Sequence, residues 1–139
     1  MAGKYAQNTS VPISRSKAQI EETFLRYGIE EFGTGVSPRG AGIIFKHENR
    51  VYKINVPDPN RDDFATDIKW EQARRVRWRV KLLSLKAKLE EIEHGLETFD
   101  DQFLAHLALP DGTTVSDFMR LPENVARLEK TKMPKLLTG

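Results

Sequence analysis

The stretch AGIIFKHENRVYKINV, residues 41–56, decides the fold. If Glu48 and Asn49 form a two-residue turn, with Asn49 accepting a positive φ, the two halves pair as an antiparallel hairpin. Three apolar pairs then share one face of the sheet: Phe45 with Tyr52, Ile43 with Ile54, and Ala41 with Val56. The opposite face carries a mixed set, typical of partial exposure: Ile44, Lys46, Val51, Lys53 and Asn55. One register satisfies every apolar pair, so the sequence predicts a hairpin with one buried face.

A helix precedes this hairpin, and a further strand joins the two. Ser16 is the expected N-terminal cap of the helix, and Gly28 is its expected end. The expected buried stripe of this helix has the spacing i, i+4 and i+7 and consists of Ile20, Phe24 and Tyr27. Leu25 is expected beside it. Residues 29–36 predict an additional strand, although two glycines interrupt it. The expected sheet therefore has about three strands.

A long helix follows the hairpin, because residues 67–94 contain neither proline nor glycine and Gly95 ends the run. Short helices are expected over residues 99–131. The predicted fold class is α+β, with an N-terminal helix, a small antiparallel sheet, one long helix and short C-terminal helices. The chain is divided accordingly into an extended arm over 1–13, a single domain over 14–131 and a C-terminal tail over 132–139.

The long helix carries two apolar stripes that lie about 180° apart on an ideal helix. The first consists of Ala73, Val76, Val80, Leu83 and Ala87. The second consists of Trp78, Leu82, Leu85, Leu89, Ile92 and Leu96. The sheet covers one stripe, and the other is covered either by residues 99–131 folding back or by a second copy in a homodimer. The expected partner interface is formed by Trp78, Leu82, Leu85 and Leu89.

Composition excludes several classes of protein. The chain has 139 residues, of which 39% are hydrophobic and 30% charged, and it has no cysteine. Disulfides, thiolate metal sites and cysteine nucleophiles are therefore excluded. There is no apolar run of about 18 residues and no apolar core of a signal peptide near the N-terminus. A cytoplasmic protein without a membrane partner is expected.

Basic side chains are concentrated in residues 69–88, which hold eight basic residues and one acidic residue, a net charge of +7. The whole chain carries +2, so the remainder carries −5. Clustered cations attract phosphate groups. The alternative is that their long stems lie along the helix and their charges pair with acidic loops. The candidate nucleic-acid-binding residues are Arg74, Arg75, Arg77, Arg79, Lys81, Lys86 and Lys88, with Lys46 and Lys53 from the hairpin.

The motifs that resemble reaction or cofactor sites are incomplete. Residues 91–94 read Glu-Ile-Glu-His, which has the spacing of di-iron helix bundles, but such sites need two copies. Gly33-x-Gly35 and Gly40-x-Gly42 do not make a dinucleotide fingerprint, and no Gly-Lys-Ser/Thr sequence is present. We therefore expect a protein that is not an enzyme, with no catalytic residues, no metal and no cofactor.

Four stretches carry a family resemblance: KYAQNTSVPISRSKAQIEETFLRYG at 4–28, WEQARRVRWRVKLLSLKAKLEEIEHGLETF at 70–99, LPDGTTV at 109–115 and KMPKLL at 132–137. Together they resemble a group of small proteins encoded by tailed bacteriophages and prophages. The chain departs from that group in its short link between Pro59 and Asp67. The resemblance implies a phage or prophage origin, a location in the cytoplasm of the bacterial host and an accessory role, and it carries no catalytic residues.

Two hypotheses follow. The leading one is a non-enzymatic phage accessory protein that binds DNA or RNA through the basic long helix. The alternative is a protein-binding phage factor, such as an inhibitor of a host defence or replication protein, that uses the second apolar face of that helix. The order of one helix, three strands and a second helix is similar to that of double-stranded-RNA-binding domains, but here the basic residues lie in the middle of the second helix.

Overall fold

The computed structural model describes residues 11–37 and 40–135. Its elements, with η for 3-10 turns, are α2 (Ile13–Arg26), β1 (Glu31–Ser37), β2 (Gly40–His47), β3 (Arg50–Val56), η1 (Arg61–Asp63), α3 (Asp67–Glu93), α4 (Phe99–Phe103), η2 (Leu104–His106), α5 (Val115–Met119) and α6 (Pro122–Leu128). This order confirms the predicted α+β class. Residues 1–10 of the expected arm lie outside the described residues, and within the described part α2 already begins at Ile13.

The three strands form an antiparallel sheet in the order β1-β2-β3. The predicted hairpin register is confirmed, since Phe45 pairs with Tyr52, Ile43 with Ile54, and Ala41 with Val56. The turn is also where it was expected, but the positive φ, 56°, belongs to Glu48. The expectation for Asn49 was wrong, because a positive φ at the first of the two central turn residues is the type II′ pattern.

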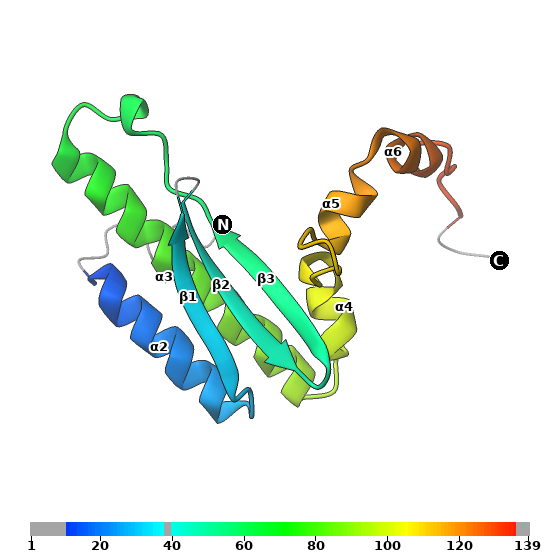
Figure 1. The fold of residues 1–139 in the computed structure, drawn as a ribbon, viewed down its shortest axis with the longest axis horizontal. Coiled ribbons are helices and arrows are strands. Elements are labelled where there is room, and N and C mark those ends of the chain that lie inside the picture. The colour runs from blue at the N-terminus through cyan, green and yellow to red at the C-terminus, as the bar shows by residue number, and fades with distance from the viewer. Residues whose placement is uncertain (1–10, 38–39, 136–139) are drawn as a thin grey trace.

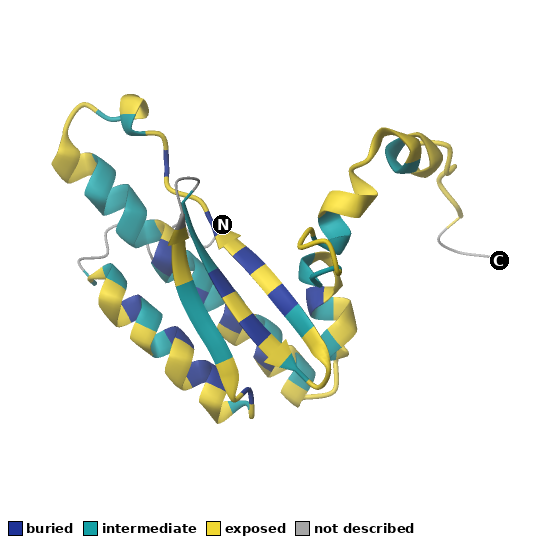
Figure 2. Ribbon diagram, viewed as in Figure 1, coloured by how far each residue is buried: buried dark blue, intermediate teal, exposed yellow. Residues whose placement is uncertain are grey.

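One face of the sheet packs against α2 and α3, and the other face is open (Figure 1). Figure 2 shows buried and exposed residues alternating along β2 and β3. Aromatic rings fill the space between the layers, with Phe45 at the centre. The ring centroid of Phe45 lies 4.8 Å from that of Phe24, 5.3 Å from that of Tyr52 and 5.4 Å from that of Phe103. The core therefore joins α2, the hairpin and α4.

The ends of α2 only partly match the prediction. Pro12, not Ser16, is the N-cap residue, with an extended backbone, so the helix begins about one turn earlier than expected. Ser16 is instead buried inside the helix. Gly28 ends the helix as predicted, with a φ of 83° that favours glycine. Leu25 is 58% exposed, because it lies about 140° around the helix from the buried stripe rather than beside it.

The long helix α3 begins and ends almost where the sequence predicted. The hydroxyl of Thr66 accepts a hydrogen bond from the Lys69 amide and caps its start. The stripe expected to contact a partner is buried in the core of this chain: Trp78, Leu82, Leu85 and Leu89 are each at most 2% exposed. These four residues are therefore unavailable to a partner in this fold, and that expectation is corrected. Leu96, expected on the same stripe, lies beyond the helix end and is 74% exposed.

The segment after α3 does not fold back over the outer stripe of that helix. The Ala108 amide donates to the Val51 carbonyl, 2.8 Å away, so this segment extends the sheet beyond β3. The following helices, α5 and α6, then project away from α3 (Figure 1). Leu128 of α6 stays 54% exposed. The expectation that residues 99–131 cover the long helix is therefore confirmed only for α4, whose Phe103 is buried in one core cluster with Leu85 and Leu89. It is wrong for α5 and α6, because pairing with the β3 edge directs the chain outward.

The hairpin register can be tested with two lysine substitutions at adjacent positions. Ile43→Lys places a charge among buried side chains and should destabilise the fold by about 3 to 5 kcal/mol. Ile44→Lys adds a charge to the exposed face and should change stability by about 0.5 kcal/mol or less. Thermal melts followed by circular dichroism measure both. Greater damage from Ile44→Lys would contradict the register.

The two stripes of α3 can be compared with matched truncations. Leu85→Ala empties a buried position and should cost about 2 to 5 kcal/mol. Leu83→Ala, on the half-buried outer stripe, should cost about 1 kcal/mol. Urea unfolding curves of the two variants give the difference. If Leu85→Ala leaves the midpoint unchanged, that stripe is not part of the core.

Candidate nucleic-acid interface

The basic side chains of α3 form two rows on opposite flanks of the helix. The buried stripe fixes the rotation of α3 against the sheet, and each residue advances about 100° around the axis. We call the two rows the β3-side row and the α2-side row, after the elements that they face. The β3-side row contains Arg74, Arg77, Lys81 and Lys88. The α2-side row contains Arg75, Arg79 and Lys86. The predicted cations therefore do not form one continuous surface.

The first two members of the β3-side row are held at the end of β3. Nε of Arg74 lies 3.1 Å from Oδ1 of Asp58, and the same guanidinium pairs with Glu71 at 3.1 Å. Arg77 donates to the Pro57 carbonyl, 2.8 Å away, and its side chain is exposed. Arg74 is neutralised by two carboxylates, whereas Arg77 keeps its charge available to a ligand.

The other two members, Lys81 and Lys88, lie near His106 of η2. Burial and then the charge of Lys88 lower the pKa of Lys81 below 10.5. Burial, followed by the charges of Lys81 and Lys88, lowers the pKa of His106 below 6.5. Nζ of Lys88 lies 5.9 Å from the ring centroid of Phe103. Among the described residues neither lysine forms an ion pair, so positive charge accumulates there without compensation.

The α2-side row lies beside the N-terminal helix. Nη1 of Arg79 donates to Oε1 of Gln19, 2.6 Å away. Lys86 lines a shallow hollow with Tyr27 and Glu90, in which the tyrosine hydroxyl donates to the carboxylate. Arg75 donates to Gln72 one turn earlier in α3. This row therefore contacts polar groups of α2 and α3, and Glu90 lies at its end.

The two hairpin lysines lie on the open face of the sheet, away from α3. Lys46 forms an ion pair with Glu31 at 3.8 Å. Lys53 donates to the Gly112 carbonyl, 2.8 Å away, and so points toward the 109–112 turn. These lysines therefore lie on a different face of the molecule from the two rows of α3, and their part in binding nucleic acid stays a prediction.

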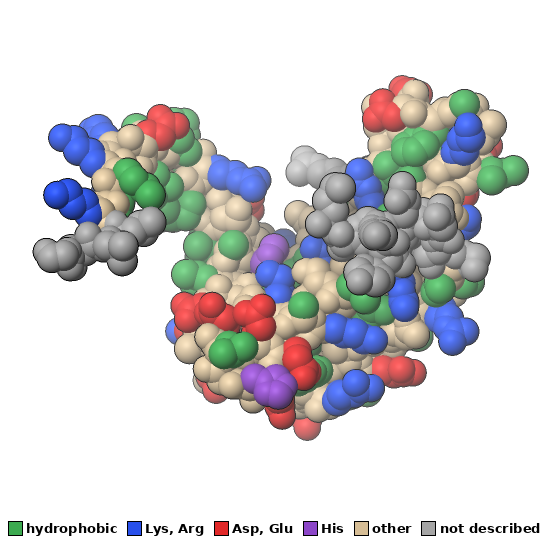
Figure 3. All heavy atoms as spheres, turned by 180° about the vertical axis from the view of Figure 1, so that it is seen from behind, with side chains coloured by type: hydrophobic (Ala, Val, Ile, Leu, Met, Phe, Trp, Pro, Cys, Tyr) green, Lys and Arg blue, Asp and Glu red, His purple; other side chains and the backbone are tan. Residues whose placement is uncertain are grey.

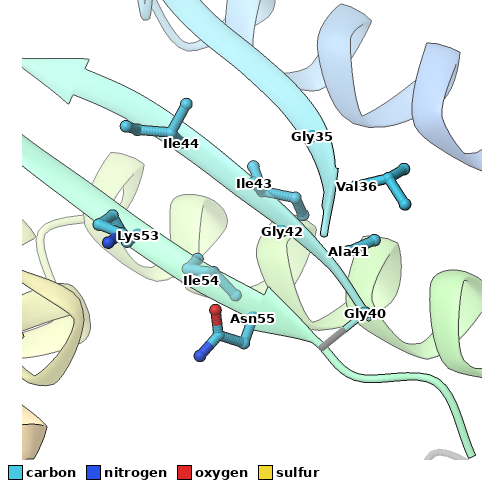
Figure 4. Close-up of a pocket in the computed structure, with 10 residues that line it drawn as sticks. All are labelled: Gly35, Val36, Gly40, Ala41, Gly42, Ile43, Ile44, Lys53, Ile54 and Asn55. Carbon is cyan, nitrogen blue, oxygen red and sulfur yellow. The ribbon is translucent and has the colours of Figure 1, made fainter. Parts of the chain in front are cut away.

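The open face also holds a shallow pocket of about 360 Å³ near the β1–β2 connection (Figure 4). Its floor is low because Gly35 and Gly42 lie on neighbouring strands and have no side chains. Ile44 and Asn55 flank it, while Lys53 is engaged with Gly112. Its polar side chains are the Asn55 amide and the Lys53 ammonium, so it presents a single charge to a ligand.

The α3 side of the molecule carries basic side chains beside a hollow in its surface. Figure 3 shows Lys, Arg and His side chains around a hollow between α3 and the C-terminal helices. Within the described part of the chain, Arg74 is the one α3 cation that forms an ion pair with a carboxylate. The predicted alternative, in which the cations are neutralised by acidic loops, therefore applies to Arg74 and not to Lys81 or Lys88.

His106 is the residue that sequence reasoning did not assign to this site. The sequence around His106 does not indicate that it lies near the cations of α3, because its position depends on the pairing of residues 107 and 108 with β3. That pairing turns η2 toward Lys81 and Lys88, which lie two turns apart on α3. Only the tertiary arrangement brings these three groups together.

The lowered pKa of His106 predicts that the stability of the fold depends on pH. Its folded pKa is lowered, so the unfolded chain binds a proton that the folded chain resists. Stability should therefore fall as the pH drops below about 6.5. His106→Gln should lose less stability over this range than the wild type in urea unfolding curves. His94→Gln, at the exposed end of α3, is the control and should keep the full loss. Equal losses in wild type and His106→Gln would contradict the assignment.

Three further observations bear on function. No described helix is long and apolar enough to cross a membrane. Within residues 11–37 and 40–135, no group of three or more His, Asp or Glu residues could hold a metal ion. Comparison with known proteins found no matching family model, no matching curated protein and no matching solved structure. The resemblance to phage-encoded proteins therefore stays a prediction.

Proposed function

We propose that this protein binds nucleic acid, DNA or RNA, through the β3-side row of α3, and that it acts without catalysing a reaction. The observation that carries the proposal is the charge of Arg77, Lys81 and Lys88. Among the described residues these three cations have no carboxylate partner, and they lie along one flank of a single rigid helix. Uncompensated cations of this kind release counterions from a phosphate backbone when they bind it.

The length of the row suits a phosphate backbone. From Arg77 to Lys88 the helix rises about 16 Å. Successive phosphates of one strand are several Å apart, so such a row can contact roughly two or three of them. Lys81 is half-buried, and this places its charge in a less polar environment than that of an exposed lysine. An anion that reaches it is therefore attracted more strongly than it would be in bulk water.

Stabilisation of the helix itself does not explain this distribution of charge. Cations stabilise a helix near its C-terminus, and anions stabilise it near its N-terminus. The last turn of α3 instead contains Glu90, Glu91 and Glu93 and no basic residue. The basic residues occupy the middle of α3, where the helix dipole gives little benefit. This supports a role for them in binding rather than in folding.

The biological setting that we propose is an accessory role in a tailed phage or prophage, within the cytoplasm of the bacterial host. It rests on the sequence resemblance alone. The genes that flank this one test it, because phage accessory genes lie among other phage genes.

Salt dependence tests the binding proposal. Changing Arg77, Lys81 and Lys88 to Gln should reduce the magnitude of the slope of log affinity against log salt by about two to three. The matched control changes Arg75, Arg79 and Lys86 to Gln, removes the same charge and should reduce the slope by about one or less. Fluorescence anisotropy with labelled DNA and RNA duplexes measures both. The proposal fails if the wild type binds neither duplex at low salt.

A protein partner is the second candidate, and the C-terminal helices favour it. Phe118, Leu121 and Leu128 are each more than 40% exposed on α5, α6 and their connection. A hollow of about 350 Å³ lies beside Phe118 and Leu128. Exposed apolar clusters of this kind mark interaction sites. Capture of one purified host protein that resists nuclease and is lost in Phe118→Lys would favour this candidate.

A further inference from the structure

The outer stripe of α3 is an apolar helix face that the fold leaves without a partner. It consists of Ala73, Val76, Val80, Leu83 and Ala87. The first four residues are half-buried, and Ala87 is exposed. Among the described residues, the core and the side chains packed against it include none of the five. α5 and α6 project away from α3 (Figure 1), so they do not cover this stripe.

The spacing of the outer stripe is that of a two-stranded coiled coil. Steps of three and four residues alternate along it, so its members occupy the a and d positions of a heptad repeat. Val80 then stands at a and Leu83 at d. A β-branched residue at a with leucine at d favours a parallel pair of helices. Lys69 and Glu90 occupy the next positions of the repeat, so the apolar seam is limited to residues 73–87.

We propose that a second copy of this chain packs its α3 against the outer stripe, parallel and in register, to form a homodimer. Two heptads are too short to hold isolated peptides together, because each peptide must also form its helix. Here α3 is already folded against the sheet, so association does not carry that cost. The proposal does not depend on nucleic-acid binding, since the β3-side row lies about 110° around the helix from the stripe.

The charged residues beside the seam complement those of a second copy. In a parallel pair, each g residue lies beside the e residue that comes five positions later on the other helix. Lys86 is then opposite Glu91 of the second copy, and this pair occurs twice in the dimer. At the preceding heptad Arg79 is opposite Ser84, and before that Gln72 is opposite Arg77. A parallel dimer therefore brings two opposite-charge pairs together and no like charges at these positions.

The antiparallel arrangement is less favourable. If Val80 of one copy lay opposite Leu83 of the other, Arg79 would lie opposite Lys86 at both ends of the seam. Two pairs of like charge would then face each other, which opposes association. The charges therefore select the parallel arrangement.

Lys86 and Glu91 are available for these contacts. Both side chains are exposed. Within residues 11–37 and 40–135 neither forms an ion pair. Oε2 of Glu91 accepts a hydrogen bond from Nε2 of Gln102 at 2.8 Å, which holds the carboxylate without neutralising its charge. An ion pair with a second copy therefore breaks no ion pair of this chain.

The size of the seam sets the strength of the dimer. From residue 72 to residue 91 the helix rises about 28 Å, and a helix with its side chains is about 10–12 Å wide. Two copies therefore bury at least about 600 Å² in total, which is at the low end of specific interfaces. The expected dimer is reversible, with a dissociation constant of about 10 to 100 μM.

Sedimentation equilibrium of the full chain, without nucleic acid, tests the proposal. The wild type should pass from monomer to dimer between about 5 and 500 μM. Leu83→Glu places a charge in the seam and should stay monomeric over this range. The matched control Leu25→Glu makes the same change at an exposed position of α2 and should dimerise like the wild type. Circular dichroism checks that both variants are folded.

A charge exchange tests the pairing at exposed positions, where folding is not affected. Lys86→Glu alone sets two pairs of carboxylates opposite each other and should weaken the dimer by about tenfold. Adding Glu91→Lys to Lys86→Glu should restore the wild-type dissociation constant, because the ion pairs re-form with their charges exchanged.

Disulfide cross-linking tests the orientation, since the chain has no cysteine of its own. In the parallel dimer Ala87 of one copy meets Ala87 of the other, so Ala87→Cys should cross-link when oxidised glutathione is added. In the antiparallel arrangement these positions are about 16 Å apart, too far for a disulfide. The control Ile44→Cys, on the open face of the sheet, should stay uncross-linked.

Each contrary result overturns the proposal. A wild type that stays monomeric up to about 500 μM shows that no second copy covers the stripe. A dimer that persists in Leu83→Glu shows that the two copies meet elsewhere. A charge exchange that does not restore the dimer contradicts the pairing of Lys86 with Glu91. Failure of Ala87→Cys to cross-link, or equal cross-linking of Ile44→Cys, contradicts the parallel seam.

Discussion

The buried stripe of α3, which contains Trp78, packs against the hairpin, and the rest of the structure depends on this contact. The hairpin has one apolar face, and its burial requires a long apolar surface opposite it. α3 supplies that surface through Trp78, Leu82, Leu85 and Leu89, and α2 completes the layer through Ile20 and Phe24. Once these contacts form, α3 cannot rotate about its own axis without exposing the core.

The fixed rotation of α3 decides where its charges lie. Residues on either side of the buried stripe must face either β3 or α2, so the basic segment is divided between two flanks. On the β3 flank the carboxylate of Asp58 neutralises Arg74, while Lys81 and Lys88 meet no acid in the described part of the chain. On the α2 flank the cations contact amide groups and lie beside Glu90. The flanks are therefore chemically different although their sequence composition is similar.

The edge of β3 has a second effect on the site. Pairing of Ala108 with Val51 places η2 beside β3, where the charges of Lys81 and Lys88 help to lower the pKa of His106. The same pairing directs α5 and α6 outward and leaves Phe118 and Leu128 exposed. One short stretch of main-chain hydrogen bonding thus sets the position of η2 and directs the C-terminal helices away from the core.

The sequence by itself determined the local features of this protein. The hairpin register, the extent of α3 and the glycine that ends α2 all follow from side-chain alternation, helical spacing and the conformational freedom of glycine, which act between residues close in the chain. Sequence periodicity also found both stripes of α3. It could not decide which stripe faces the sheet, because the two are similarly apolar.

Tertiary structure alone decided that Trp78 and Leu85 are core residues rather than a partner interface. It alone decided that Lys46 and Lys53 lie apart from α3, and that His106 joins Lys81 and Lys88, because these relations depend on contacts between segments far apart in the chain.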